Sequence, residues 1–389
     1  MSRVGRVIGR EMRRLGRFPM LWCLLGPIPL AAWLLLVGVF HSEVARQLPI
    51  AICDLDGSEA ARTAARWVGA TRTVIVVRRV EDLGTAEDLL VRRDVYAALV
   101  IPLHFERDLL QGRSPHVTLL YNEQYLTAGN LIAADVSRAV QTGSGAVSVA
   151  MQRSRGLTGE AARAAANPVR VDAHLLFNPA INYARGVGLV LVAGLLQIVV
   201  GLSSIYVVGR ELRDGTAGEW LAAAGGSLTA AWIGKLAPYL LYDLVLMLAI
   251  VGGFVSWFGI PVLGHLGLLA LGGTAFALAT QAIGVLLTVW TGNLRKALGL
   301  GSILFGPSVA FSGGTFPRIA MPAFAQVWGG CVPLTRFLLV LRDQVLVGAS
   351  LHVSAAPVCA LVGTALVAGL LAAPRVGRVL KDPRLWGGA

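Results

Sequence analysis

The feature that most constrains this chain is a series of long stretches without charged side chains. The first covers residues 19–40. As a helix it is about 33 Å long, which is enough to cross a hydrocarbon core of about 30 Å. Five further apolar stretches occur after residue 185. They predict spans over residues 186–208, 231–257, 263–290, 298–311 and 354–373.

Composition agrees with a membrane protein. Charged residues make up 14% of the chain and hydrophobic residues 55%, with a mean hydropathy of +0.67, whereas a soluble chain is about a quarter charged. The net charge of +12 would suit a nucleic-acid-binding protein. However, residues 41–178 contain 15 arginines and 15 acidic residues, and the basic excess lies beside the apolar stretches. This placement indicates membrane topology and no nucleic-acid partner.

The basic residues also predict an orientation. Six arginines precede the first span, Arg295 and Lys296 separate two later spans, and four basic residues follow the last. We expect these regions, and therefore both termini, on the cytoplasmic side. Residues 1–18 form an amphipathic interfacial helix in this interpretation, and residues 375–389 a basic cytoplasmic tail. A cleaved signal peptide is the alternative for residues 19–40, but its apolar region usually has only about 7 to 15 residues.

Residues 41–178 differ in character from the rest of the chain. Short β-rich runs alternate there with polar helical stretches, which is the βαβ pattern. Strands are expected over residues 48–55, 74–77, 96–101, 117–121 and 169–177, and helices over residues 58–68, 81–92, 105–110 and 128–153. The predicted fold class is a membrane all-α bundle of six transmembrane helices with an inserted extracytoplasmic α/β domain.

The segment 179–374 carries the second to sixth spans, and its fifth stretch is unusual. That stretch is short, and Pro307 interrupts it. Residues 313–336 then combine apolar side chains with several prolines, which favours an external re-entrant hairpin or paired short helices over a span. The hairpin residues singled out are Phe316, Pro317, Met321, Pro322 and Pro333.

Residues 210–230 form a cytoplasmic loop whose pattern ends one helix and begins another. Gly215 can adopt the left-handed conformation that ends a helix, and Thr216 with Glu219 three residues later has the spacing of a capping box. A short amphipathic helix should follow, with Trp220 on an apolar side that faces lipid headgroups or a partner. A plain connection between two spans has the same spacing, so the pattern alone leaves both interpretations open.

Few polar residues within the spans could carry chemistry. Asp243 is the only acid there, and it either lines a pathway or packs against a neighbouring helix. Gln197 is open to the same two interpretations. The scattered histidines and cysteines have no metal-site spacing, and the spans contain no nucleophile with a base. We therefore predict no metal site and no catalytic residues.

Five short motifs occur in order along the chain. They are Arg-Glu with Gly-Thr and Glu (Arg210, Glu211, Gly215, Thr216, Glu219), Gly-Lys with Pro-Tyr (Gly234, Lys235, Pro238, Tyr239), Ser-Gly with Phe-Pro (Ser312, Gly313, Phe316, Pro317), Met-Pro (Met321, Pro322) and Pro-Leu-Thr (Pro333, Leu334, Thr335). With these motifs the chain resembles the six-helix permease subunits of bacterial ABC-2 type exporters that carry a large periplasmic domain. It departs from them at residues 223–226, Ala-Ala-Gly-Gly, where that family usually has Thr-Pro.

The resemblance implies the partners and the site. The loop helix of such a permease inserts into a separate ABC ATPase subunit, and a second permease completes the pathway. The residues it assigns to ATPase coupling are Arg210, Glu211, Gly215, Thr216, Glu219, Trp220 and Lys235. ATP and Mg²⁺ would bind the partner ATPase, because this chain has no Gly-x-x-x-x-Gly-Lys-Ser/Thr loop. A periplasmic adaptor protein is a further partner to consider, and membrane lipid surrounds the spans.

The function expected on these grounds is that of an exporter permease in the bacterial cytoplasmic membrane, with no enzymatic activity of its own. Its Gly-rich, weakly polar spans suit a hydrophobic or amphipathic substrate such as a drug, a lipid or a lipid-linked polymer. The alternative is a membrane-anchored sensor or scaffold whose periplasmic domain binds a ligand. That alternative needs no ATPase, so a neighbouring ATPase gene would discriminate between the two.

Overall fold

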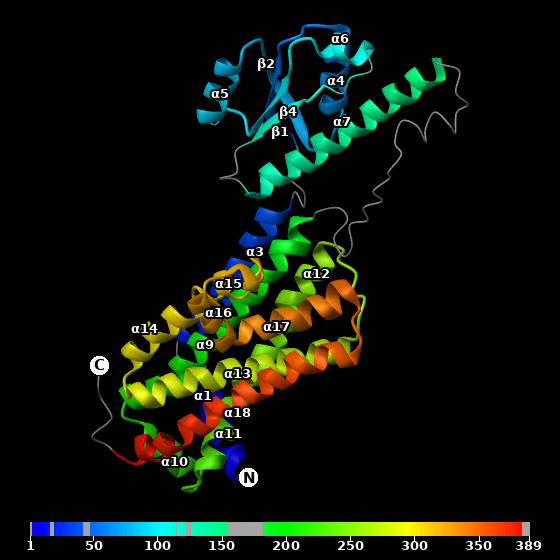
Figure 1. Ribbon diagram of the computed structural model, residues 1–389. Coiled ribbons are helices and arrows are strands. Elements are labelled where there is room, and N and C mark those ends of the chain that lie inside the picture. The colour runs from blue at the N-terminus through cyan, green and yellow to red at the C-terminus, as the bar shows by residue number, and fades with distance from the viewer. Residues whose placement is uncertain are drawn as a thin grey trace. The chain divides into compact units, whose positions relative to one another are not determined.

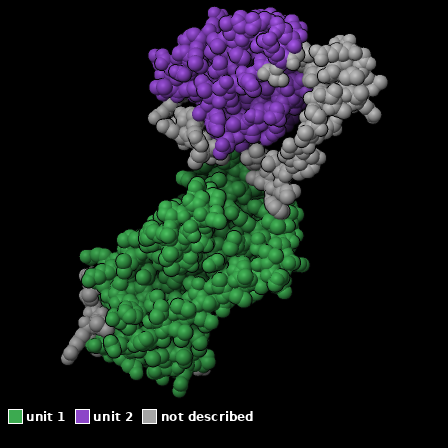
Figure 2. All heavy atoms as spheres, in the orientation of Figure 1, with its two compact units in different colours: residues 1–43, 176–389 green, residues 44–175 purple. Residues whose placement is uncertain are grey.

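In the computed structural model the described residues are 2–15, 19–41, 47–92, 94–111, 113, 115–121, 126–154 and 182–382. The chain divides into two compact units, which Figure 2 distinguishes by colour: Met1–Glu43 with Leu176–Ala389, and Val44–Leu175. Each unit has its own buried core and is described by itself. The strand predicted over residues 169–177 lies outside the described residues.

The first unit is built from helices (Figure 1). The α-helices are, in chain order, α1 (Arg3–Leu15), α2 (Pro19–Leu25), α3 (Pro27–Phe40), α9 (Leu189–Arg213), α10 (Ala217–Ala223), α11 (Leu228–Met247), α12 (Gly253–Trp257), α13 (Leu266–Thr291), α14 (Leu294–Phe305), α15 (Ser308–Phe311), α16 (Ala323–Cys331), α17 (Pro333–Arg342) and α18 (Leu351–Lys381). Short π-helices cover Ala184–Gly188, Leu248–Gly252 and Asp343–Val347, and a short 3-10 helix covers Arg318–Ala320.

Five segments among the described residues have the length and hydropathy of membrane spans: Cys23–Phe40, Ala184–Arg213, Leu228–Trp257, Leu266–Thr291 and Leu351–Lys381. They confirm the second, third, fourth and sixth predicted spans as helices of spanning length. The first is confirmed as an 18-residue candidate span, Cys23–Phe40, which includes the break at Gly26 between α2 and α3. The sequence predicts them well because an uncharged helix of about 20 residues satisfies its own backbone hydrogen bonds in lipid. The last helix continues to Lys381, so the basic tail predicted at 375–389 begins inside it.

The predicted fifth span, residues 298–311, is wrong as a continuous helix. α14 has 12 residues and is therefore about 18 Å long, and the four-residue α15 follows after a turn at Gly306 and Pro307. The physical reason is that proline lacks the backbone N–H of a helix interior and its ring clashes with the preceding turn. This stretch is a pair of short helices instead.

The pair nevertheless follows α9 over most of its length. Glycines of α9 make room for it, and a methyl group on any of them would collide with a side chain of the pair: Leu294 at Gly209, Phe305 at Gly201 and Val309 at Gly194. Farther along, Gly314 lies against Val190 of α9. Between Gly209 and Val190 the axis of α9 rises by about 28 Å, close to the thickness of a hydrocarbon core.

The next two helices form a sharp bend. Ala323–Cys331 and Pro333–Val347 meet at 79°, with Val332 between them. The backbone N–H of Leu334, at the start of α17, donates to Gln197 Oε1 near the middle of α9. At the far end Arg342 donates to the carbonyl of Gly314, where this segment begins. A helix pair with this bend is either a broken span or a re-entrant loop, and the external hairpin stays a prediction.

The second unit contains a four-stranded sheet of β1 (Leu48–Asp54), β2 (Val74–Val80), β3 (Ala97–Ile101) and β4 (Thr118–Tyr121). The strand order is β2-β1-β3-β4, with β4 antiparallel to its neighbour and the others parallel. Its helices are α4 (Glu59–Gly69), α5 (Leu83–Val91), α6 (Phe105–Leu110) and α7 (Leu126–Ser154). The strands and helices predicted over residues 48–153 are thus confirmed within a few residues.

The two faces of this sheet bury different side chains because successive strand residues point in opposite directions. On one face Ile50 and Ile52 pack with residues of α4, α6 and α7. On the other face Ala51 and Cys53 pack with Ala86 of α5. The unit therefore has helices on both faces and a core of its own.

We expect the excised second unit, residues 43–176, to melt cooperatively at neutral pH and to lose stability in acid. Burial tends to raise the pKa of Asp56, but hydrogen bonds from the Ser58 hydroxyl and the Glu106 backbone N–H outweigh it and hold this pKa below its usual range. The pKa of Asp82 is lowered too, chiefly by Thr85. A carboxyl whose folded pKa is depressed stabilises the fold above its unfolded pKa, and this contribution disappears as pH falls through the folded value.

The measurement is thermal unfolding by circular dichroism between neutral pH and about pH 3, a range that includes the usual carboxyl pKa values. Asp56→Asn should lower the neutral-pH stability by about 1 kcal/mol and weaken the dependence on acid. Glu87→Gln removes an exposed carboxyl and is the control. A melting temperature that is independent of pH in this range would contradict the expectation.

Candidate functional site

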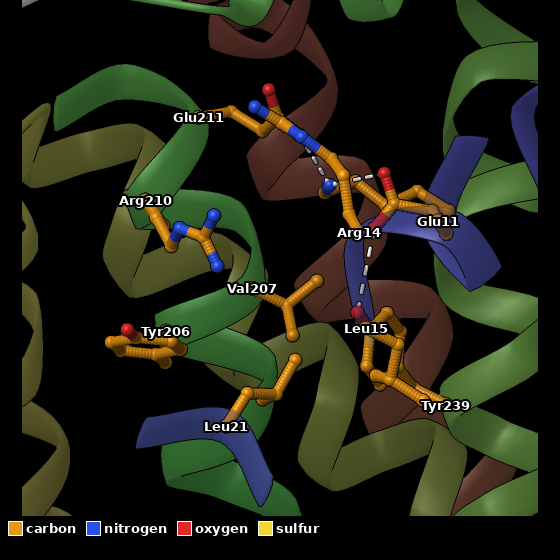
Figure 3. Close-up of a pocket in the computed structure, with 10 residues that line it drawn as sticks. Glu11, Arg14, Leu15, Leu21, Tyr206, Val207, Arg210, Glu211 and Tyr239 are labelled. Atoms are coloured by element: carbon orange, nitrogen blue, oxygen red, sulfur yellow. Dashed lines mark hydrogen bonds and ion pairs between the residues drawn. The ribbon is translucent and has the colours of Figure 1, made fainter. Parts of the chain in front are cut away.

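Charged side chains from three helices meet inside the helical unit, near α10. Arg10, Glu11 and Arg14 come from α1, Glu211 from α9 and Lys235 from α11, and together we call them the charge cluster. Figure 3 shows Glu11, Arg14 and Glu211 with the dashed contacts that join residues of this region. A small cavity of about 20 Å³ lies beside them and is bordered by Tyr206 and Arg210.

Glu211 is the central acceptor of the charge cluster. Arg10 binds it with both terminal nitrogens, Nη1 at 2.8 Å from Oε1 and Nη2 at 3.0 Å from Oε2. Arg14 donates to the same carboxylate. Lys235 Nζ lies 2.9 Å from Glu211 Oε1 and 2.9 Å from Glu11 Oε1. The cluster therefore joins α1 to both α9 and α11 through paired charges.

Because these ion pairs are buried, the loss of one partner would destabilise the fold more than the loss of a surface ion pair. Glu11, Glu211 and Lys235 are almost completely buried, and a buried charge is tolerated only when it is paired and hydrogen-bonded. Burial tends to lower the pKa of Arg10, but its hydrogen bond to Glu211 and the charges around it raise that pKa above the usual value. Arg10 therefore stays positively charged.

The charge cluster has one positive charge in excess, since three cations face two carboxylates. Glu219 of α10 approaches from outside, with Oε2 3.7 Å from Arg10 Nη2. Its side chain is 72% exposed, so this contact is weak. Glu219 thus offsets the excess charge in part and remains open to solvent.

Close packing holds α1 against α11. Gly234 lies beneath α1, and a methyl group there would come within 2.6 Å of Val7 and 3.0 Å of the Val4 carbonyl oxygen. Val7 is completely buried at this contact. The glycine of the Gly-Lys motif therefore lets α1 approach, and the lysine that follows enters the charge cluster.

The end of α9 is built as the sequence predicts. Gly215 has φ of +68°, the left-handed conformation. The N–H of Gly215 donates to the Leu212 carbonyl at 3.3 Å, and the N–H of Thr216 donates to the Glu211 carbonyl at 3.0 Å. This pair of bonds ends a helix in the Schellman manner, and it brings Thr216 back over Glu211.

The predicted capping box of Thr216 and Glu219 is wrong. The Thr216 side chain makes no capping bond to α10, and its hydroxyl donates to the Glu211 carboxylate instead. The Thr216 N–H is also occupied, by the Glu211 carbonyl. The reason is competition: the turn at Gly215 brings a buried carboxylate within reach of Thr216, and Glu219 turns outward toward Arg10 and solvent.

The prediction that Trp220 faces lipid or a partner is also wrong. Trp220 is completely buried, and its ring packs edge-on against Trp232 of α11 with centroids 4.9 Å apart. Its indole N–H donates to the Ala231 carbonyl at 3.0 Å, and Lys235 Nζ lies 4.8 Å from the ring centroid. Trp220 therefore fastens α10 to α11. Any part it has in ATPase coupling is indirect, by holding α10 in place.

The structure brings together most of the loop residues that the sequence singled out. Glu211, Thr216 and Lys235 are in contact, while Arg210 pairs with Asp214 four residues later at 3.0 Å. The sequence interpretation missed the α1 members, Arg10, Glu11 and Arg14. A signal existed in Glu11, which is the only acid in the arginine-rich helix Arg3–Leu15, but its buried partner Lys235 lies 224 positions away in the chain.

The two polar residues proposed for a pathway both make contacts between helices. Asp243 accepts a hydrogen bond from Gln281 of α13 at 2.8 Å, and its other oxygen has no partner among the described residues. Gln197 donates to Ser308 and accepts from the Leu334 N–H, both at 2.7 Å. These contacts fit the packing alternative, and a role in a pathway stays a prediction.

The hairpin residues lie apart from the charge cluster. Pro333, at the start of α17, and Met321 are both buried. Phe316, Pro317 and Pro322 are exposed. Beside them Phe311, Phe324 and Trp328 form an aromatic group. Within the described residues no group of three or more His, Cys, Asp or Glu side chains has the arrangement of a metal site.

Comparison with known proteins agrees with this architecture. Residues 18–373 match the family model described as "ABC-2 family transporter protein". Two curated relatives, both named "Probable multidrug ABC transporter permease YbhS", come from Escherichia coli strain K12 and from Escherichia coli O157:H7. Each is 26% identical over 183 residues, which are 47% of this chain and 45% of the relative, so the match spans less than half of either. Because the family model covers most of the chain, this multi-pass membrane protein belongs to the ABC-2 family of transporter proteins.

Proposed function

We propose that this chain is the membrane-spanning permease subunit of an ATP-driven exporter, working as a dimer with a separate ABC ATPase. The observation that carries the proposal is the charge cluster together with the exposed part of α10 beside it. The charge cluster joins α1, α9 and α11. Glu219 contacts Arg10 of this cluster and projects into solvent. ATP and Mg²⁺ bind the partner ATPase in this proposal, and this chain needs no cofactor.

The partner would contact what we call the coupling surface, the exposed residues around α10. These are Arg213, Asp214, Gly215, Glu219 and Ala222. The turn that ends α9 and the short helix that follows present them together. Asp214 stays ionised there: burial tends to raise its pKa, but hydrogen bonds from Arg213 and Arg210 outweigh this and lower it. A mixed-charge, glycine-containing surface of this kind suits a protein partner better than a lipid surface.

Movement of α10 would reach the spans by two connections. Trp220 fixes α10 to α11 through Trp232 and Ala231. Glu219 contacts Arg10, which binds Glu211 at the end of α9. Because paired buried charges and packed aromatic rings resist deformation, a displacement of α10 should move α1, α9 and α11 together. This is the mechanical step that we assign to ATP-dependent coupling.

Exposed apolar side chains and the curated relatives bear on the remaining partners and the substrate. Large apolar side chains around the hairpin are exposed, among them Phe316, Phe324 and Ile319, which is 90% exposed, and such patches favour a second permease or lipid. We place the hairpin and the second unit outside the cytoplasm, where an adaptor protein could bind, and the spans in the bacterial inner membrane. The name of the curated relatives supports a hydrophobic or amphipathic substrate.

Glu219→Ala should uncouple transport from ATP hydrolysis. We expect about a tenfold drop in substrate-stimulated hydrolysis, the effect of removing a residue that contributes strongly to an interface. Membrane insertion and dimerisation should be unchanged because the side chain is mostly exposed. Glu219→Gln can keep one hydrogen bond to the partner and should be milder. The measurement is ATP hydrolysis and export by the chain purified with its partner ATPase.

Arg295→Gln is the matched control. Arg295 is an exposed charge at the start of α14, and Leu294 beside it lies against Gly209 near the same end of α9. The control should keep full stimulated hydrolysis. If Glu219→Ala also keeps it, the coupling surface is assigned wrongly, and a chain that recruits no ATPase at all would support the sensor or scaffold alternative.

A further inference from the structure

An apolar cavity of about 550 Å³ lies beside the charge cluster, on the other flank of α1. The break between α2 and α3, at Leu25 and Gly26, forms a third wall. The side chains that shape the cavity are Ile8, Met12 and Leu15 of α1 and Ala237, Pro238 and Leu241 of α11. Its volume lies within the range of small-molecule sites, about 300 to 1,000 Å³.

A helix break and a proline inside a helix border this space. Gly26 has a non-helical backbone between α2 and α3, and Pro27 begins the new helix. Pro238 lies inside α11, which continues as a helix from Leu228 to Met247. Gly26 and Pro238 both line the cavity together with the apolar side chains of α1.

Among the described residues, the side chains that line the cavity offer carbon and no free hydrogen-bonding group. Only Tyr239 and Tyr242 bring hydroxyl groups among the residues that line the cavity. The Tyr239 hydroxyl donates to Glu11 at 3.4 Å, and the Tyr242 hydroxyl donates to the Leu25 carbonyl. Water in such a cavity would lack polar partners. An aliphatic chain, in contrast, would gain contact with every wall.

The mouth of the cavity continues into an apolar exterior. Leu241 is 66% exposed and Met12 is 47% exposed at this opening. Ile233 and Val245 extend the exposed apolar surface along α11, which is a candidate membrane span. A membrane-spanning helix meets hydrocarbon on such a face, so the cavity opens where lipid chains lie.

One exposed arginine of α1, Arg13, follows Met12 in the sequence and favours an anionic headgroup near the opening of the cavity. Arg10 and Arg14 are used by the charge cluster. Arg13 is exposed, and its one hydrogen bond within the described residues runs from Nε to the Gly9 carbonyl of its own helix. Its two terminal nitrogens remain for a ligand. Arginines beside an apolar helix face are typical of segments that bind anionic lipid surfaces.

We propose that this cavity binds one acyl chain of an anionic membrane phospholipid, with the phosphate beside the exposed Arg13 of α1. The bound acyl chain would fill the space between α1 and α11. The site does not depend on transport or on the ATPase. It is therefore separable from the proposed function.

The test uses the full chain in nanodiscs of phosphatidylethanolamine that contain a trace of phosphatidylglycerol with a diazirine at the end of one acyl chain. After irradiation, labelled peptides are mapped by mass spectrometry. We expect the peptides of Ile8 to Leu15 and of Ala237 to Tyr242 to be labelled above the exposed stretch near Leu248. Phosphatidylcholine with the same diazirine should label them about fivefold less, the expected effect of one arginine beside an anionic headgroup.

Ala237→Phe should fill the cavity and reduce this labelling to the background of the exposed stretch. Ala249→Phe places the same ring at an exposed position of the same span, outside the cavity, and should leave labelling unchanged. If Ala237→Phe fails to give a monodisperse protein, Ile8→Trp fills the space from the α1 side. Labelling of the wild type at background level, or equal labelling of the wild type and the filled variant, would overturn the site. Equal labelling by both lipids would overturn the anionic assignment.

Discussion

Glu211→Ala is expected to detach α1 from the helical unit and to destabilise the folded protein strongly. The carboxylate of Glu211 pairs with Arg10, Arg14 and Lys235, and Lys235 is almost completely buried. Removing one partner of a buried ion pair costs about 3 to 5 kcal/mol because a charge is left without compensation. We expect a large loss of protein in the membrane fraction and a lower melting temperature in detergent.

Three further variants separate charge from packing. Glu211→Gln keeps the shape and some hydrogen bonds, so it should be intermediate. Glu211→Gln with Lys235→Met removes both charges of one pair and should recover part of the stability lost in Glu211→Gln, since an apolar replacement of a buried pair is often tolerated. Glu219→Ala should melt like the wild type. A wild-type melting temperature for Glu211→Ala would show that the charge cluster does not hold α1.

Trp220→Ala is expected to release α10 from α11. The completely buried ring packs on Trp232 and its N–H bonds to Ala231, and truncating a buried aromatic residue costs about 3 to 5 kcal/mol. Hydrogen exchange of residues 214–227 should rise strongly, and the chain should become sensitive to proteases at Gly225 and Gly226. ATPase co-purification should fall as well, because the coupling surface loses its support.

Trp220→Phe distinguishes packing from hydrogen bonding. It keeps a ring beside Trp232 and loses the bond to the Ala231 carbonyl, so we expect a loss of only about 1 kcal/mol. Leu221→Ala alters a half-buried neighbour on the same helix and should have a small effect. If Trp220→Ala leaves exchange in α10 unchanged, the helix is held by other contacts and our account of its attachment is wrong.

The spans and the elements of the second unit could be predicted from the sequence because their causes are local. An uncharged apolar run determines a spanning helix by length alone, as for Leu266–Thr291 and Leu228–Trp257. A short apolar run that ends at a polar residue favours a strand such as Leu48–Asp54, and four consecutive residues of this strand are buried because both faces of the sheet are covered. The fifth span shows the limit, since Pro307 marked the interruption but not the path of the two short helices along α9.

Gly215 and Glu219 show the same contrast within one loop. The left-handed conformation of Gly215 follows from its missing side chain and needs no distant contact. The capping box required hydrogen bonds between Thr216 and Glu219. The turn at Gly215 instead brings the Thr216 hydroxyl to the Glu211 carboxylate, to which it donates. A local pattern predicts a local bond only when no buried group competes for the same donor.

The sequence by itself determined that this chain is a membrane protein with an inserted α/β unit, because hydropathy, charge placement and periodicity are read along neighbouring residues. Only the tertiary structure decided which charges are paired and which faces are buried. Arg10 and Glu211, which form an ion pair, are 201 positions apart. Trp220 is buried because it packs against Trp232 and Lys235 of another helix. Such partners are chosen by packing in three dimensions, where the desolvation of buried groups sets the energy and sequence distance has no bearing.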